Sequence, residues 1–326
     1  MTRSSPDDHT IPPAVAPVAA GEARPLWSVM IPTFNCAAYL RHTLESVLDQ
    51  DPGPAAMQIE VVDDCSTRDD PEAVVRVVGG GRVEFHRRPA NGGATRNFNT
   101  CIDRSRGHLV HILHGDDLVM PGFYRLLAEA AERHPDRALL ASRALYIDEA
   151  GVVFGVSDRV RQLEEGTVDV TPMLVQNRLC TPGVVIRRGF YERHGGFRPD
   201  LVHTADWEMW TRAIGAGGGV VLPDAAAQYR EFAANDTSRL RRQADNLRDV
   251  ERAFRVFAAR YPAFDWRPAR QRLEHEAAAQ VDLFRRLGDR EAHAANLAYY
   301  REAAPPLRRA ARRVKAALHR IAERIA

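Results

Sequence analysis

The sequence predicts an α/β fold in which helices cover a largely parallel sheet. From Trp27 onward, short apolar runs of strand length alternate with longer stretches that carry apolar residues at helical spacing. The run SVMIP is followed by a helical pattern over 38–50, and this order then repeats. Such alternation is typical of parallel strands joined by crossover helices. The next expected strands cover 59–64, 82–86 and 108–113, and the next expected helices cover 71–78, 94–104 and 122–134.

The remainder of the chain predicts more strands and then helices alone. A strand-rich stretch over 138–155 precedes expected strands at 183–188, 220–223 and 226–231. From Ser238 the pattern is helical to the end. The expected division is a disordered leader over 1–25, an α/β domain over 26–237 and a helical region over 238–326.

The composition argues against several classes of protein. The chain has 326 residues, 45% of them hydrophobic and 27% charged, so it can bury a large core. A formal net charge of +2 gives no support for nucleic-acid binding. The four cysteines form no Cys-x-x-Cys pair, which argues against a zinc site or a redox pair. From this cysteine pattern we expect reduced thiols and a cytoplasmic location. Neither a signal peptide nor a run of about 20 apolar residues is evident.

Polar clusters follow three of the expected strands. PTFN (32–35) comes after the first strand, DDCST (63–67) after the second, and HGDD (114–117) after the fourth. Because loops at the carboxyl ends of parallel strands converge at one edge of the sheet, these residues can meet in a single ligand crevice.

The two acidic pairs each allow two interpretations. Asp116 and Asp117 can hold Mg²⁺ or Mn²⁺, which then bridges phosphate oxygens. They can instead cap the helix that follows, since carboxylates are favoured at helix starts. Asp63 and Asp64 can bind the ring N–H or ribose hydroxyls of a nucleoside, or they can cap a turn.

The segment NGGATRN predicts an anion site at a helix start. Backbone N–H groups at Gly92 and Gly93 and the helix dipole could face an anion, and Arg96 could neutralise a diphosphate. A simple turn with a surface arginine is the alternative.

The segment TADWEMW carries a candidate general base. Asp206 stands at the start of an amphipathic helix in which Trp207 and Trp210 should be buried. A carboxylate shielded by aromatic groups can have a raised pKa and can deprotonate a hydroxyl. A helix N-cap is the alternative role.

Taken together, these motifs resemble, in order and spacing, the family 2 glycosyltransferases of the GT-A fold. The resemblance extends from about Trp27 to Glu231. It implies a GT-A, Rossmann-like mixed sheet flanked by helices, with the C-terminal helical region as an appendage. It also implies a nucleotide-sugar donor and a divalent cation, Mn²⁺ or Mg²⁺, as cofactor.

The resemblance assigns a role to each matching position. Two departures are visible, because His114 replaces the first acid of the family's Asp-x-Asp and Phe232 stands where a histidine often follows the Tyr-Arg pair. Arg230 remains a candidate phosphate contact. The implied roles are contacts to the base by Pro32, Thr33, Phe34 and Asn35, to base or ribose by Asp64 with Asp63 beside it, to diphosphate by Arg96, to metal by Asp116 and Asp117, and general-base catalysis by Asp206.

The function implied is inverting transfer of a sugar, with UDP as the expected carrier, to a hydroxyl of a glycan, a lipid-linked molecule or a small molecule. The expected context is synthesis of a cell-surface polysaccharide or glycoconjugate. One alternative is a sugar-nucleotide pyrophosphorylase, although PTFNCAAYLRHT lacks the Gly-rich basic loop usual in that class. Another is a catalytically silent carbohydrate-binding or assembly protein.

The segment 305–326 predicts a basic amphipathic helix. Such a helix suits an anionic surface, so one hypothesis is peripheral contact with the inner face of the plasma membrane. Packing of its apolar stripe on the protein is the alternative.

Overall fold

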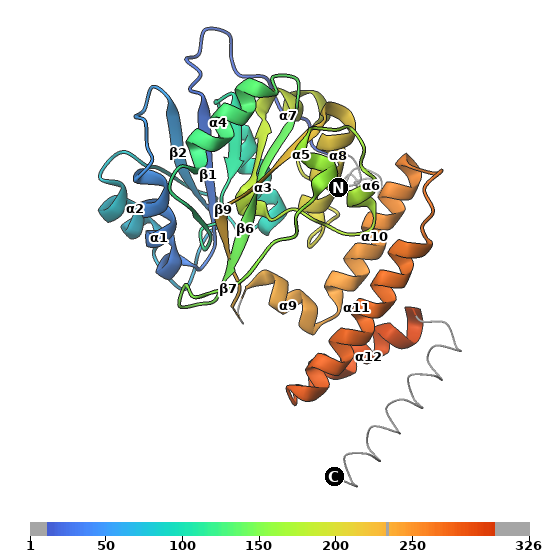
Figure 1. Cartoon of the computed structure of the whole chain (residues 1–326). Coiled ribbons are helices and arrows are strands. Elements are labelled where there is room, and N and C mark those ends of the chain that lie inside the picture. Colours follow the sequence, from blue (N-terminus) through green and yellow to red (C-terminus); the bar gives the residue numbers. More distant parts are fainter. Residues whose placement is uncertain (1–11, 233–234, 304–326) are drawn as a thin grey trace, which may run out of the picture. The chain divides into compact units, whose positions relative to one another are not determined.

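A computed structural model describes residues 12–232 and 235–303 (Figure 1). The chain divides into two compact units, 1–232 and 233–326. The division falls slightly before the expected boundary at 237, because helix α9 (Asp236–Arg242) packs with the helices that follow it. The predicted tail helix at 305–326 lies outside the described residues.

A mixed sheet forms the centre of the first unit. In the described residues its strand order is β3-β2-β1-β4-β8-β6-β9-β5, and β7 pairs with β6. The first four strands are mutually parallel, as predicted, whereas β8 is antiparallel to both of its neighbours. The bounds are β1 (Trp27–Thr33), β2 (Met57–Asp63), β3 (Glu84–Arg87), β4 (Leu109–Ile112), β5 (Leu118–Val119), β6 (Leu139–Ile147), β7 (Val153–Val156), β8 (Val184–Arg187) and β9 (Gly219–Arg230).

Helices lie on both faces of this sheet (Figure 1). Alternate residues of a strand point to opposite faces, so Val29 and Ile31 of β1 join a core that includes apolar residues of α1, α2 and α4. On the other face α3 holds Glu60 of β2 through Arg104. The bounds are α1 (Ala37–Leu48), α2 (Pro71–Gly79), α3 (Ala94–Arg104), α4 (Phe123–Arg133), α5 (Arg161–Glu164), α6 (Thr171–Leu174), the 3₁₀ helix η2 (Thr181–Gly183), α7 (Arg188–His194) and α8 (Ala205–Gly217).

Two strands differ from the prediction. The two strands expected at 220–223 and 226–231 are one long strand, β9, whose pairing with β6 shifts register near Arg143. The pairing passes from Val221 to Ala225, so Pro223 lies within the register shift and the strand continues past it. Strand β5 was not predicted, because two residues are too few to show a period.

The described part of the expected disordered leader, residues 12–25, lies against the first unit. The amide of Gly196 donates to the carbonyl of Pro13, and the guanidinium of Arg188 donates to the carbonyl of Ala16. Arg24 in turn donates to the carbonyls of Arg106 and Gly107. These bonds order a segment whose composition alone resembled a leader.

The second unit is a set of helices with its own core. Its helices are α9, α10 (Asp245–Arg260), α11 (Arg267–Arg286) and α12 (Arg290–Ala303). Buried side chains from α10, α11 and α12, including Leu247, Leu273 and Tyr299, pack together. Among the described helices of either unit, none has the length and apolar character needed to cross a bilayer.

Gly107 offers a test of the close approach between β1 and the segment that joins α3 to β4. A Cβ atom at this position would lie 2.6 Å from the backbone nitrogen of Ser28, where nothing can move without shifting the strand. We predict that Gly107→Ala lowers the free energy of unfolding by about 1–3 kcal/mol. Urea denaturation followed by circular dichroism measures this change.

Gly189→Ala is the matched control. Its new Cβ would meet only the end of the Arg193 side chain, at 3.3 Å, and it lies inside a helix. Unfolding of this variant should be unchanged or slightly harder, because alanine is the better helix former. Equal loss of stability in both variants would show that the close approach at Gly107 is not the cause.

Candidate active site

The ends of β1, β2 and β4 meet at one edge of the sheet, as the sequence predicted. Thr33, the last residue of β1, pairs with Asp63, the last of β2. The amide of Asp64 donates to the carbonyl of Thr33 over 2.9 Å, and the amide of Gly115 donates to the carbonyl of Pro32 over 3.1 Å. PTFN, DDCST and HGDD therefore adjoin one another.

Side-chain hydrogen bonds join the first two of these loops. Asn35, in a left-handed conformation with φ 51°, accepts from the amides of Thr67 and Arg68 through Oδ1, both over 2.9 Å. Its own amide donates to Oγ of Ser66. Phe34 stands beside this junction with 44% of its surface exposed. The loop thus presents an accessible aromatic ring on a fixed backbone.

Asp63 is buried and holds its own loop. Both of its oxygens accept from the amide of Ser66 over 3.1 Å, and Oδ1 also accepts from the hydroxyl of Ser66 over 2.5 Å. A guanidinium nitrogen of Arg87 lies 3.3 Å from Oδ2. Within the protein, the contacts of Asp63 are therefore those expected of a residue that caps a turn.

Asp64 connects the second loop to the start of α3. Its carboxylate accepts from the amide of Gly93 over 2.8 Å and from the amide of Gly92 over 3.0 Å, and it forms an ion pair with Arg88. The anion that these two amides face is accordingly a carboxylate of the protein itself. Gly93 has φ 84°, a conformation that requires glycine, whereas a Cβ on Gly92 would displace the Arg88 guanidinium, 2.5 Å away.

Arg96 lies in the first turn of α3, with its side chain exposed. The same turn is tied to the segment before α8, because the Thr95 hydroxyl donates to the carbonyl of Leu201 over 3.0 Å. Phe98, also in α3, stacks on His114, with ring centroids 5.0 Å apart and an angle of 11° between the ring planes. The predicted anion segment therefore borders the HGDD loop.

Asp117 does not cap a helix. The helix that follows begins at Phe123 with Gly122 as its N-cap, and Asp117 instead precedes β5. Its Oδ1 accepts from the backbone amide of Arg230 over 2.9 Å. Burial and the neighbouring Asp116 raise the pKa of Asp117.

The Arg230 side chain braces the same loop. Its guanidinium donates to the carbonyl of Asp116 over 3.0 Å and to the carbonyls of Asp148 and Glu149 over 3.1 and 3.0 Å. It also lies over the ring of Tyr39, 5.0 Å from the centroid. Arg230 is buried, and these contacts fix the backbone that carries the two acids.

The HGDD loop has the donor set of a hard-cation site. His114, Asp116 and Asp117 can each offer one ligand atom, and these atoms lie within 4.8 Å of one another. Oδ2 of Asp117 is buried and accepts no hydrogen bond within the described part of the chain. A buried carboxylate oxygen in that state is costly unless a cation satisfies it. Carboxylate oxygens are the ligands that Mg²⁺ and Mn²⁺ prefer, so the residues fit the expected cofactor.

Asp206 is the second residue of α8, and Thr204 is the N-cap. Oδ2 of Asp206 accepts from Asn177 over 3.1 Å and from the Thr181 hydroxyl over 3.3 Å, and Oδ1 accepts from the amide of Trp207 over 2.6 Å. Burial raises the pKa of Asp206, an effect that His203 and these hydrogen bonds only partly offset. Trp207 and Trp210 are buried, as predicted.

The short helix η2 links Asp206 to the strand edge. Thr181, which bonds Asp206, begins η2, and the carbonyl of the next residue, Pro182, lies 3.0 Å from Nε2 of His111 in β4. β4 leads directly to HGDD. The general-base candidate and the cation candidate therefore border the same end of the sheet.

Sequence reasoning missed several residues that position the site. Arg88 braces Asp64, and Asn177 and Thr181 bind the carboxylate of Asp206. Ser66 and Arg230 lie in segments that the sequence analysis named, but their bracing contacts were not predicted. Asn177 and Thr181 lie in a segment with no recognisable motif, so no pattern in the sequence pointed to them.

Comparison with known proteins identifies the family. The model described as Glycosyl transferase family 2 matches residues 28–193. The uncharacterized protein MT1568 of Mycobacterium tuberculosis is 29% identical over 246 residues, which cover 72% of this chain and 76% of that protein. The poly(ribitol-phosphate) beta-N-acetylglucosaminyltransferase TarS of Staphylococcus aureus is 26% identical over 213 residues, which cover 62% of this chain and 35% of TarS.

Two solved structures share the fold. Residues 1–349 of S. aureus TarS, in complex with UDP-GlcNAc, align with a TM-score of 0.56 at 18% identity and cover 87% of this chain and 92% of that one. The mannosyltransferase PcManGT of Pyrobaculum calidifontis, in complex with GDP-Man and Mn²⁺, aligns with a TM-score of 0.55 at 19% identity and covers 94% and 83%. Because the family model matches just over half of the 326 residues, the chain belongs to glycosyl transferase family 2, and it is a glycosyltransferase with the GT-A fold.

Proposed function

We propose that this glycosyltransferase moves a sugar from a UDP-sugar to an acceptor hydroxyl with inversion at the anomeric carbon. The observation that carries the proposal is the meeting of a cation-type acid pair, Asp116 and Asp117, and a shielded carboxylate, Asp206, at one end of the sheet. The first suits a diphosphate leaving group, and the second suits deprotonation of a hydroxyl. Family membership argues against the pyrophosphorylase alternative, and the acids present at Asp64, Asp116 and Asp206 argue against a catalytically silent protein.

The donor is assigned to the edge formed by PTFN and the two loops beside it. Phe34, with Pro32, Thr33 and Asn35, would border the base, and Asp64 would contact base or ribose while it holds the glycine loop. Arg96, exposed at the start of α3, would meet the diphosphate. TarS and PcManGT, the structural neighbours, bind UDP-GlcNAc and GDP-Man, which supports a sugar nucleotide of this kind.

Two residues from the predicted donor set are assigned supporting roles. Both carboxylate oxygens of Asp63 accept hydrogen bonds from Ser66, and the Arg230 guanidinium donates hydrogen bonds to three backbone carbonyls. We assign Asp63 to shaping the turn that carries Asp64. We assign Arg230 to fixing the backbone of Asp116 and Asp117, and its contact with phosphate stays a prediction.

Transfer would proceed by in-line displacement. Asp116 and Asp117 would hold the cation, which would neutralise charge on the departing diphosphate. Asp206 takes the proton of the acceptor hydroxyl as the oxygen attacks the anomeric carbon, and Arg96 binds the leaving group. The raised pKa of Asp206 makes it a stronger base than an exposed aspartate.

The acceptor is proposed to be a growing polysaccharide or glycoconjugate. The relative TarS is named for the transfer of N-acetylglucosamine to poly(ribitol-phosphate), and this chain spans 35% of that protein. A cytoplasmic location and peripheral membrane contact through 305–326 remain predictions.

Asp206→Asn tests the general base. The amide keeps the size and the acceptor oxygen of the side chain but cannot take a proton, so we predict that sugar transfer falls about 10²- to 10⁴-fold with the fold retained. Single-turnover transfer assays measure the rate. Asp136→Asn, at an exposed acid on the turn before β6, is the control and should keep full activity. Near-normal transfer by Asp206→Asn would remove Asp206 from the role.

The pH dependence of transfer offers a second test. Because Asp206 must be ionised to act, the rate should fall as pH is lowered, with a midpoint above the usual aspartate pKa of about 3.9. The Thr181 hydroxyl bonds the ionised form, so Thr181→Val should move the midpoint upward by about 0.7 pH unit, equivalent to about 1 kcal/mol. A midpoint that stays fixed in Thr181→Val would mean that another group titrates.

Thermal unfolding tests the donor and the cation together. UDP with Mn²⁺ should stabilise the protein by about 2.7 kcal/mol at 100 times Kd, and UDP alone should stabilise it less. Asp116→Asn should lose the increment due to Mn²⁺ and keep the part due to UDP, because the base contacts lie on other loops. An equal Tm with and without Mn²⁺ in the unaltered protein would contradict the cation site.

A further inference from the structure

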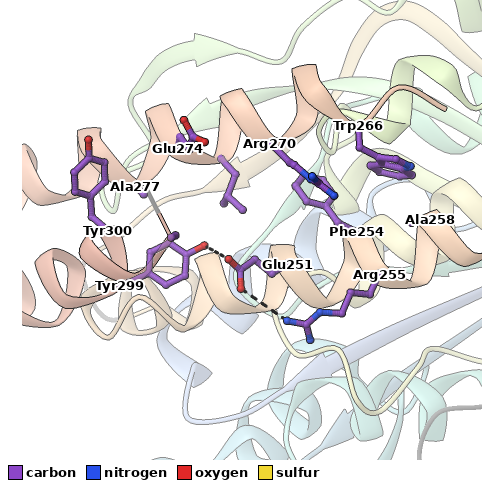
Figure 2. A pocket seen from close by; sticks show the side chains of 12 residues that line it. Glu251, Phe254, Arg255, Ala258, Trp266, Arg270, Glu274, Ala277, Tyr299 and Tyr300 are labelled. Atoms are coloured by element: carbon purple, nitrogen blue, oxygen red, sulfur yellow. Dashed lines mark hydrogen bonds and ion pairs between the residues drawn. The ribbon is translucent and has the colours of Figure 1, made fainter. Parts of the chain in front are cut away.

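The second unit contains a cavity of about 360 Å³ between α10, α11 and α12. This volume lies in the range of sites that enclose small ligands. Figure 2 shows the side chains of Phe254, Trp266 and Tyr299 along its wall, with Glu251 and Arg270 among them. Aromatic faces and charged groups thus line one cavity, far in the sequence from the family's motifs.

Trp266 is held firmly in this wall. Its ring packs against Phe254 at a centroid distance of 5.7 Å and against Phe264 at 4.9 Å. Its indole nitrogen is buried and has no hydrogen-bond partner within the described ranges. An indole N–H buried in this way costs stability unless an acceptor reaches it, and native proteins seldom retain one without a reason.

Polar groups of the cavity offer both donors and acceptors. The Tyr299 hydroxyl donates to Glu251 over 2.9 Å, and a guanidinium nitrogen of Arg255 lies 4.0 Å from the other oxygen of Glu251 (Figure 2). Arg270 is exposed, and its guanidinium forms no hydrogen bond or ion pair with another described residue. A purely apolar ligand would remove water from Arg270 and leave the Trp266 N–H unsatisfied.

The cavity continues along α10 into a second one of about 390 Å³. The two share Glu251, Arg255 and Tyr299 as lining residues. The second cavity adds Arg248, Arg252 and Glu302, and both of these arginines form ion pairs with aspartates of α10. The combined groove has room for more than one ring-sized group, with aromatic residues at one end and ion-paired arginines at the other.

We propose that this groove binds an oligosaccharide segment of the acceptor, preferentially one that bears carboxylate or phosphate groups. A sugar ring has an apolar C–H face that can lie on an aromatic ring and a rim of hydroxyls that can accept from Trp266 and Arg270 and donate to Glu251. An acidic substituent would meet Arg270, because the other groove arginines, Arg248, Arg252 and Arg255, already have carboxylate partners. The acceptor assignment rests on the proposed function, whereas the groove is formed by the helical unit alone.

Ligand binding to the full-length protein tests this proposal without any donor present. The probes are a neutral glucan oligosaccharide and a uronic-acid oligosaccharide of equal length, titrated by calorimetry and by tryptophan fluorescence. We expect the acidic probe to bind more tightly, with an affinity that falls as salt is raised. Of the four tryptophans, Trp27, Trp207 and Trp210 are buried in the first unit, so a fluorescence change would report Trp266.

Three variants separate the groove from general effects. Trp266→Phe keeps an aromatic ring but removes the N–H, and Arg270→Gln removes an exposed charge, so each should weaken binding about tenfold without loss of fold. Arg272→Gln, an exposed arginine of α11 that does not line the groove, is the matched control and should bind normally.

Several outcomes would overturn the proposal. These are the absence of binding by either probe, equal binding by all variants, and binding that arises only after removal of residues 304–326, which would make that segment the occupant. Asp206→Asn should bind the probe as well as the unaltered protein does. Asp206→Asn should lose transfer and keep probe binding, whereas Trp266→Phe should lose probe binding and keep transfer. These two patterns distinguish failure of the groove proposal from failure of the proposed reaction.

Discussion

The parallel register of β1, β2 and β4 is the constraint on which the site depends. It places Thr33 beside Asp63 and the backbone of Pro32 beside Gly115, so three loops emerge at one edge. Side chains alternate between faces of a strand, and a slip of one residue would exchange the orientations of Asp63 and Asp64. The apolar faces packed against α1 and α3 fix this register, because a slip would expose the core. The chemistry of the loops therefore rests on hydrophobic packing beneath them.

The acids at this edge differ in how their charge is balanced. Asp63 and Asp64 have Arg87 and Arg88 beside them and accept several hydrogen bonds, so each carboxylate has partners within the protein. Asp117 and Asp206, by contrast, have raised pKa values because burial outweighs their favourable contacts. A raised pKa marks a carboxylate whose negative charge the protein has not fully compensated. Such groups are suited to gain a cation or a proton during the reaction.

The sequence predicted the framework of the site better than its detailed contacts. Strand ends such as VVDD and HLVHILHGDD could be placed because period and length identify buried strands, and parallel topology then brings their ends together. The engagement of the Gly92 and Gly93 amides by Asp64 could not be predicted, since it depends on the path of a loop between β3 and α3. Asn177 and Thr181 were hidden for the same reason, because tertiary structure alone brings them to Asp206.

A carbohydrate site in the helical unit would solve a kinetic problem that the catalytic edge cannot solve alone. An acceptor hydroxyl offers few contacts of its own, and a long glycan presents many chemically equivalent positions. If another segment of the same glycan is bound elsewhere on the protein, the approach of its hydroxyl to Asp206 becomes intramolecular. The local acceptor concentration then depends on the length and stiffness of the intervening glycan. Because this gain needs no contact with the reacting atoms, Trp266 and Arg270 could influence the acceptor KM while kcat remains set by Asp206. Recognition of the polymer and transfer chemistry can in this way be carried by separate parts of one chain.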